Sequence, residues 1–146
     1  MNLEISTEPL RLTLFGYGGA IEAGNVAASG KRLMDSMWNE VQTRRIANKG
    51  INHWVYLPNS MIFTGVELVA PVSEVGTLEK IEVSLERYAK YVHVGPYALL
   101  PQIWPQLFVQ LAQRNEQPRF PNLEIYGHWN PDPTQCETTI VIDLIP

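Results

Sequence analysis

A single carboxylate in an otherwise apolar strand is the residue of this sequence best placed to do chemistry. Glu124 lies in the segment "PNLEIYGHW" (121–129), between Leu123 and Ile125. Because side chains alternate along a strand, Glu124 points away from the face of these two neighbours and shares a face with Tyr126. If that face meets water, Glu124 is a solubilising residue. If it lines a cavity, the buried charge is costly unless a cation or hydrogen-bond donors compensate it.

Aromatic residues accompany this carboxylate. Trp54 and Tyr56 share one face of the segment "INHWVYL" (51–57), as Glu124 and Tyr126 share one of theirs. Aromatic rings attract a cation by about 0.5–2 kcal/mol each. We therefore interpret Glu124 as a candidate counter-charge for a cation. The candidate ligand-binding residues are Glu124, Trp54, Tyr56, Tyr91, Tyr126, Phe63 and Trp104; Phe63 and the additional candidate Trp129 are weaker, and for Trp104 core packing competes with a cleft role.

The elements that must position these residues begin with a strand over 10–17. A helix follows, indicated by an apolar stripe of helical period, and is expected to end near Asn48–Gly50. The segments 51–57 and 61–69 are predicted strands, joined by a turn at Pro58–Ser60. The helix stripe consists of Leu33, Met34, Met37, Trp38 and Val41.

The same order of elements follows a linker around residues 70–79. Extended structure over 80–95, interrupted near Ser84–Arg87, precedes a second helix. Pro105 inside this helix predicts a kink or a late start. The segments 123–129 and 137–145 are the last two predicted strands. The second helix stripe consists of Leu100, Ile103, Trp104, Leu107, Phe108 and Leu111.

Short matches between the halves, in the same order, indicate an internal duplication. "LMDSMW" (33–38) parallels "LLPQIW" (99–104), and "VELV" (66–69) parallels "IDLI" (142–145); Asn52 and Tyr56 parallel Asn122 and Tyr126. In this alignment Trp54 falls at the position of Glu124. The sequence therefore predicts one α+β domain over 1–146, made of two βαββ repeats of about 1–72 and 78–146. A pseudo-twofold axis would relate them, with an antiparallel sheet, two helices on one face and a central cleft, where ligands tend to bind.

Composition excludes several classes of protein. The 146 residues are 45% hydrophobic and carry a formal net charge of -4, so a nucleic-acid surface is not expected. No run of ~18 apolar residues predicts a membrane span. Cys136 is the single cysteine, which rules out an internal disulfide and favours a cytoplasmic protein. The three histidines have no metal-ligand spacing, and neither a metal nor a cofactor is expected. "GYGG" (16–19) lacks a phosphate-loop continuation and is interpreted as a flexible turn.

The segment "YVHVGPYALLPQIWPQLF" (91–108) resembles the GyrI-like, or AraC-type effector-binding, superfamily. In that family a strand ending in His-x-Gly-Pro-Tyr leads into a helix that carries a tryptophan. The C-terminal pattern also matches: a strand with Glu124 and Tyr126, then "NPDP" (130–133) and a closing strand ending in proline. The resemblance implies binding of small molecules, often hydrophobic cations, between the repeats. It also implies that Glu124 neutralises the ligand, and that the domain serves as a sensor in transcription regulation or in drug sequestration.

Three functions remain open at this point. The first is a stand-alone receptor for amphipathic, cationic, drug-like molecules, and the second is a small-molecule hydrolase in which Glu124 activates water. The third is an interaction protein that inhibits a macromolecular target. We expect a binding protein rather than an enzyme, without direct binding to nucleic acid or membranes. A regulatory protein partner, a monomeric or homodimeric state, and a loop over 16–30 that covers the cleft are left open.

Overall fold

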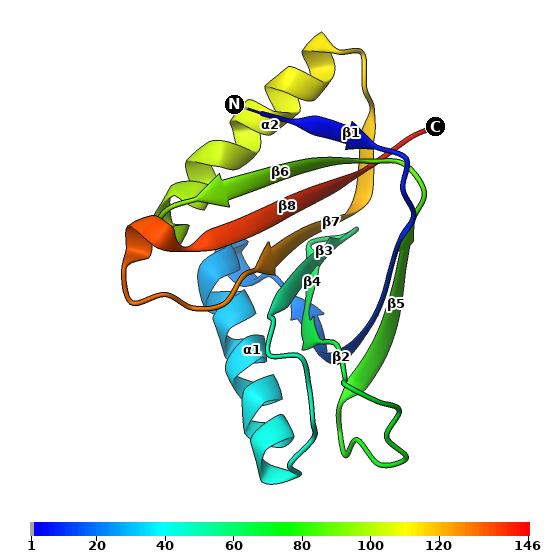
Figure 1. Cartoon of the computed structure of the whole chain (residues 1–146), viewed down its shortest axis with the longest axis vertical. Helices are drawn as coiled ribbons and strands as arrows, with labels where there is room; N and C mark the ends of the chain where they lie inside the picture. The colour runs from blue at the N-terminus through cyan, green and yellow to red at the C-terminus, as the bar shows by residue number, and fades with distance from the viewer. Residues whose placement is uncertain (1) are drawn as a thin grey trace.

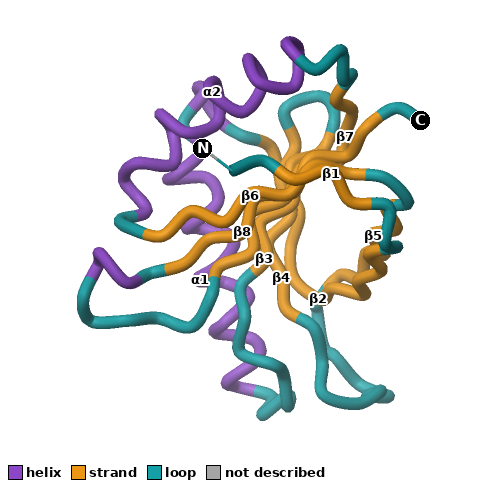
Figure 2. The backbone as a smooth tube through the Cα atoms, turned by 45° about the horizontal axis from the view of Figure 1, so that its top comes forward, coloured by secondary structure: helices purple, strands orange, loops and turns teal. Residues whose placement is uncertain are grey.

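The structure, a computed structural model, describes residues 2–146. Its eight strands form one antiparallel sheet in the order β1-β6-β8-β7-β3-β4-β2-β5. The sheet is curled into a half-barrel, and both α-helices lie on one of its faces (Figures 1 and 2). This arrangement confirms the predicted α+β fold with duplicated βαββ units. The strands are β1 (Glu4–Ser6), β2 (Leu10–Ala20), β3 (His53–Leu57), β4 (Met61–Val66), β5 (Glu79–Leu85), β6 (Tyr88–Val94), β7 (Pro118–Tyr126) and β8 (Glu137–Leu144), and the helices are α1 (Val26–Thr43) and α2 (Leu100–Gln113).

The pseudo-twofold axis passes between β3 and β7. On one side the order is β3-β4-β2 and on the other β7-β8-β6, so equivalent strands lie at equal distances from the centre. The remaining strands are exchanged: β1 pairs with β6, and β5 pairs with β2. Each repeat thus lends its first strand to the sheet edge of the other repeat. The sequence pattern did not predict β1, a short strand of three residues.

Both helices end with the same backbone conformation and hydrogen bond. Arg45 has φ of 54° and Asn115 φ of 57°, a left-handed conformation that stops a helix. The next amide in each case donates back, from Ile46 N to Val41 O at 3.0 Å and from Glu116 N to Leu111 O at 2.9 Å. The first helix therefore ends before the Asn48–Gly50 segment where it was expected to end.

The other end of each helix also corrects the sequence reading. α1 begins at Val26, where the side chain of Asn25 accepts a hydrogen bond from Ala28 N at 3.1 Å. Only residues 21–25 therefore connect β2 to α1, instead of a loop over 16–30. α2 begins at Leu100 and continues through Pro105, so of the two alternatives predicted from this proline, a kink or a late start, the late start is wrong.

The glycine run "GYGG" (16–19) lies within β2 and is not a turn. Gly16 is paired with Gly65 on β4. A Cβ atom on Gly16 would lie 1.8 Å from the carbonyl oxygen of Thr64, so no other residue fits here without displacing the backbone. Gly16 serves the close approach of two strands, for which the local sequence pattern offers no signal.

Apolar side chains fill the space on both faces of the sheet. One cluster packs beneath α1 and includes Met37 and Val41, and another packs beneath α2 and includes Leu107 and Leu111. A third, around Leu123, fills the opposite face inside the curl. No helix in the described part of the chain is long and apolar enough to cross a membrane. The helix-facing side of the central strands β3 and β7 therefore lies between the core beneath α1 and the core beneath α2.

Candidate functional site

Glu124 lies at the centre of the molecule, next to the pseudo-twofold axis. It is the direct cross-strand partner of Trp54, and Tyr56 is the partner of Asn122. The backbone of Tyr126 donates to the carbonyl of Asn52 at 2.9 Å, which completes the symmetric arrangement. One row of cross-strand partners crosses the six inner strands through Tyr17, Thr64, Trp54, Glu124, Ile140 and Tyr91.

The carboxylate of Glu124 is buried, with 3% of the residue exposed. Its Oε1 accepts hydrogen bonds from the hydroxyls of Tyr56 at 2.6 Å and Tyr126 at 2.8 Å. Its Oε2 accepts one from Trp104 Nε1 at 2.8 Å. Burial, and then the charge of Glu124, raises the pKa of both tyrosine hydroxyls. Both tyrosines are therefore protonated donors at neutral pH.

The donors around Glu124 are all neutral. Within residues 2–146, no lysine, arginine or histidine side chain forms an ion pair with it. The other deeply buried carboxylate, Asp143, is paired with Arg119 Nε at 2.9 Å. A buried carboxylate is normally compensated by a cation. Glu124 has hydrogen bonds without such compensation, which is the arrangement expected of a site that takes up a positive charge.

Aromatic rings enclose the carboxylate. Trp54 meets Tyr126 edge to face with ring centroids 5.6 Å apart, and Tyr56 meets Trp104 in the same way at 5.8 Å. Tyr56, Trp104 and Tyr126 are only partly buried, whereas Glu124 beneath them is not accessible. We call Glu124 and these four aromatic residues the central cluster. A cation beside Glu124 could interact with several of these rings at once.

Secondary structure holds each ring in place. Trp54, Tyr56 and Tyr126 project from β3 and β7, and Trp104 reaches down from α2. Gly30 of α1 lies against Trp54: a Cβ atom there would be 2.4 Å from Cζ3 of the indole. The absence of a side chain at Gly30 therefore leaves room beneath the helix for the six-membered ring of the indole.

The other predicted residues lie outside the central cluster. Tyr91 shares its row and face but is two strands from Glu124, packed in the core beneath α2. Phe63 faces the opposite side of the sheet, because it pairs with Val55 in the core inside the curl. Trp129 lies in the loop after β7 and is 75% exposed. The sequence fixes alternation along a strand, but only the pairing register decides which of two faces is shared.

Tyr97 was not singled out from the sequence, although it belongs to the "GPY" motif before α2. Its ring stacks edge to face on Tyr126 with centroids 5.3 Å apart. Tyr97 is 38% exposed, so it extends the central cluster to the surface. It also borders a pocket of about 290 Å³. That pocket is lined by Pro96, Tyr97, Ala98, Trp129, Asn130, Pro131, Pro133 and Cys136.

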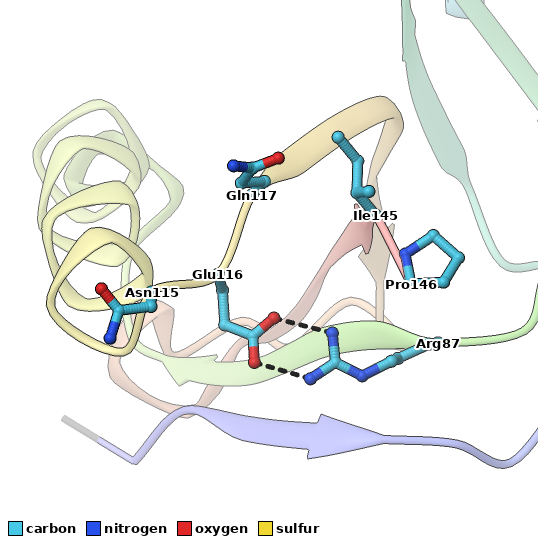
Figure 3. Close-up of a pocket in the computed structure, with 6 residues that line it drawn as sticks. All are labelled: Arg87, Asn115, Glu116, Gln117, Ile145 and Pro146. Carbon is cyan, nitrogen blue, oxygen red and sulfur yellow. Dashed lines mark hydrogen bonds and ion pairs between the residues drawn. The ribbon is translucent and has the colours of Figure 1, made fainter.

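A second pocket, of about 550 Å³, lies beyond the C-terminal end of α2 and contains no predicted site residue. Arg87 and Glu116 point toward each other there and form two hydrogen bonds, of 2.6 and 2.7 Å (Figure 3). This contact holds the pKa of Glu116 below its usual value. Because the two charges neutralise each other, this pocket has little to offer a charged ligand.

Two of the histidines, His53 and His93, lie close to backbone carbonyls, which suits a structural role. His53 Nδ1 is 3.1 Å from the carbonyl oxygen of Ile51, and burial lowers its pKa. His93 Nε2 is 3.1 Å from the carbonyl oxygen of Pro96, at the turn into α2. In the described chain, residues 2–146, no three His, Cys, Asp or Glu side chains are grouped so that they could hold a metal ion.

Known structures share this fold over nearly the whole chain. No protein-family model and no curated protein matches the sequence. The C-terminal domain of EcmrR matches with a TM-score of 0.73 and 16% identity, covering 99% of each chain. SAV2435 bound to tetraphenylphosphonium matches with a TM-score of 0.70 and 14% identity, over 99% of this chain and 94% of that one. A hydrolase from Listeria innocua matches with a TM-score of 0.60 and 9% identity, over 98% and 91%. The chain therefore has the fold of GyrI-like effector-binding domains, which confirms that resemblance at the level of the fold.

Proposed function

We propose that this protein is a reversible receptor for amphipathic organic cations, with Glu124 as the counter-charge and the surrounding rings as walls. The observation that carries the proposal is the buried Glu124 carboxylate, which has three neutral hydrogen-bond donors and no ion pair among the described residues. A cation at this position gains charge pairing in a poorly solvated environment together with contacts to several rings.

The comparison with SAV2435 supports this ligand class. Tetraphenylphosphonium, which that protein binds, is a cation whose charge is covered by aromatic groups. Such an ion has no N–H donor, so a receptor can hold it only by charge, ring contacts and apolar burial. Glu124 supplies the charge, and Trp54, Tyr56, Trp104 and Tyr126 supply the ring contacts.

The rings must move or open to admit such a ligand. Tyr56 and Tyr126 both donate to the same oxygen of Glu124. We propose that an entering cation displaces at least one of these hydrogen bonds and that charge pairing offsets the loss, since each is worth about 1.5–3 kcal/mol to a charged group. Partly exposed Tyr97, stacked on Tyr126, marks the side from which the ligand enters.

The test uses two ions of the same shape and opposite charge. Wild-type protein is titrated with tetraphenylphosphonium and with tetraphenylborate, and binding is followed by tryptophan fluorescence and calorimetry. We expect clear preference for the cation. In Glu124→Gln the cation affinity is expected to fall about 10- to 100-fold, because the charge is lost while the side-chain size is kept.

The matched control is Glu8→Gln, which removes an equal charge from an exposed position. It is expected to bind tetraphenylphosphonium as wild type does. Circular dichroism verifies that each variant is folded. If Glu124→Gln prefers the cation over the anion as strongly as wild type does, Glu124 is not the counter-charge.

A hydrolase is the second candidate, favoured by one observation: Glu124 and Tyr126 are in direct hydrogen bond at 2.8 Å within a poorly solvated cluster. A carboxylate could activate water there while the tyrosine hydroxyl polarises an electrophilic ring. The hydrolase from Listeria innocua has the same fold. Consumption of small reactive ring compounds by wild type and not by Glu124→Gln would favour this candidate over reversible binding.

The biological role that we propose depends on ligand binding. EcmrR carries a domain of this fold at its C-terminus. We propose that the present chain acts either as the sensing component of a regulatory system or by sequestering its ligand. Retention of the protein on a regulator only in the presence of tetraphenylphosphonium would identify the first role.

A further inference from the structure

Unpartnered polar atoms gather on one face of the sheet. Among the described buried side chains, four nitrogen or oxygen atoms have no hydrogen-bond partner: Trp54 Nε1, Thr64 Oγ1, Asn122 Oδ1 and Thr138 Oγ1. The pairing register places all four on the face that carries Glu124. Each unsatisfied buried polar atom is costly, by about 1–3 kcal/mol. All four lie on the strands around Glu124, so a ligand that enters there could satisfy those atoms that lie close enough together to bind one of its polar groups.

Trp54 and Thr64 form the most closely associated pair of these residues. They are direct cross-strand partners on β3 and β4, so their Cβ atoms are about 4.5–5.5 Å apart. Trp54 is 8% exposed and Thr64 is fully buried. Trp54 Nε1 can only donate a hydrogen bond, while the hydroxyl of Thr64 can donate or accept. An acceptor oxygen could therefore be bound by both.

The indole of Trp54 is oriented by α1. Its six-membered ring meets Gly30, with Cζ3 and Cη2 nearest to the position of an added Cβ. Nε1 lies on the opposite edge of the indole and so points away from Gly30. On its other neighbouring strand Trp54 is paired with Glu124. A donor group and an anionic group thus lie side by side, one from each repeat.

We propose that the ligand of the central cluster carries an oxygen acceptor beside its positive charge, and that Trp54 Nε1 and Thr64 Oγ1 bind this oxygen. The inference rests on the proposed function and narrows its ligand class, from amphipathic cations in general to cations with an ether, carbonyl or hydroxyl oxygen a short distance from the charge. Glu124 recognises the charge, and the Trp54–Thr64 pair distinguishes an oxygen from a methylene group.

The test compares alkyltriphenylphosphonium ions that differ in one atom. Pentyltriphenylphosphonium is the hydrocarbon reference. Its methoxypropyl and ethoxyethyl analogues have chains of the same length with one methylene replaced by oxygen, at two distances from phosphorus. Affinities are measured by calorimetry for wild type, Thr64→Val and Thr138→Val. Valine has nearly the shape of threonine and replaces its hydroxyl with a methyl group.

In Thr64→Val we expect the affinity for the better-bound ether analogue to fall about 2- to 12-fold. The affinity for the pentyl ion is expected to remain unchanged. Thr138→Val is the matched control, because Thr138 is equally buried and unpartnered but opposes Tyr126 on β8. It should bind both kinds of ion as wild type does. Thermal unfolding of the free protein should show Thr64→Val to be at least as stable as wild type.

Two failures are distinguishable. If Thr64→Val changes the affinities for ether and pentyl ions equally, or changes neither, the oxygen-binding role is overturned while cation binding by Glu124 stands. If no phosphonium ion binds wild type, the proposed function itself fails, and this inference with it. Trp54→Phe provides a second variant: loss of ether preference there supports the inference, and retained preference contradicts it.

Discussion

The two repeats use equivalent tryptophans differently. In the first repeat, Trp38 on α1 donates its indole N–H to Asn52 Oδ1 at 2.7 Å. In the second repeat, the equivalent Trp104 on α2 donates to Glu124 instead, at 2.8 Å. Asn122, which corresponds to Asn52, has an unpartnered Oδ1. In the first repeat this hydrogen bond joins the helix to an amide of the sheet. In the second repeat the equivalent hydrogen bond joins the helix to a buried carboxylate.

This difference shows how a duplicated scaffold can acquire a site without a change of fold. The backbone arrangement around the axis is symmetric, whereas the residues at equivalent central positions are Trp54 and Glu124. The first repeat supplies an aromatic wall with a free N–H, and the second supplies the charge. The asymmetry lies in side chains alone, so point variants can separate the tryptophan that joins helix to sheet from the equivalent tryptophan that contacts Glu124.

The larger effect expected from this comparison of the repeats comes from exchanging each tryptophan for phenylalanine. Trp38→Phe removes the donor to Asn52 and should lower the free energy of unfolding by about 1–2 kcal/mol, with cation affinity unchanged. Trp104→Phe removes a donor to Glu124 and the ring most favourable for a cation. It should lower tetraphenylphosphonium affinity about 2- to 5-fold. Urea unfolding and calorimetric titration measure the two quantities.

Each tryptophan variant is the control for the other, since both lose an indole from the helix side of the sheet. An equal loss of affinity in both would show that the repeats contribute alike to binding. That result would remove the functional difference between the two halves.

A second contrast is found just after each helix. Ile46 follows α1 and is 6% exposed in the core, whereas the equivalent residue after α2 is Glu116, which binds Arg87 through two hydrogen bonds. The same backbone turn is thus fixed by apolar burial in one repeat and by an ion pair in the other. Only the second of these contacts depends on pH.

The smaller expected effect is a pH-dependent difference in stability for Glu116→Gln. The hydrogen bond from Arg87 lowers the pKa of Glu116 from its ordinary value of 4.5. A lowered folded-state pKa adds stability that is complete above pH 4.5 and is lost as the pH falls through the folded-state value. The stability gap between wild type and Glu116→Gln should therefore be constant at neutral pH and shrink in acid.

The control is Glu86→Gln, which breaks the exposed pair of Glu86 with Arg11. Exposed pairs contribute little to stability, so this variant should follow wild type throughout the titration. A gap for Glu116→Gln that does not change with pH would assign the effect to packing instead of charge.

Much of the architecture followed from pattern. Helical stripes, strand alternation and the matched positions Asn52/Asn122 and Tyr56/Tyr126 predicted the duplicated α+β fold. They also placed Trp54 and Glu124 at equivalent positions, and the structure makes these two residues cross-strand partners. Local periodicity was sufficient for these predictions because both repeats show the same pattern. Equivalent strands of two such repeats can pair with each other across a pseudo-twofold axis.

The remaining features depend on contacts distant in sequence. The exchange of β1 and β5 between repeats is decided by pairing across the sheet. Gly16 of β2 is explained by the backbone of β4, which lies far along the chain. Phe63 could not be assigned to a face until its register with Val55 was known. The helical stripe left both a core role and a cleft role for Trp104, and only the approach of α2 to β7 places its indole N–H on Glu124.

A structure of the complex with tetraphenylphosphonium tests the central claim most directly. We expect the phosphorus atom beside the Glu124 carboxylate, among the rings of the central cluster, with at least one tyrosine hydrogen bond to Oε1 broken. An ion held only in the pocket between Tyr97 and Trp129, with all three hydrogen bonds to Glu124 intact, would contradict the account.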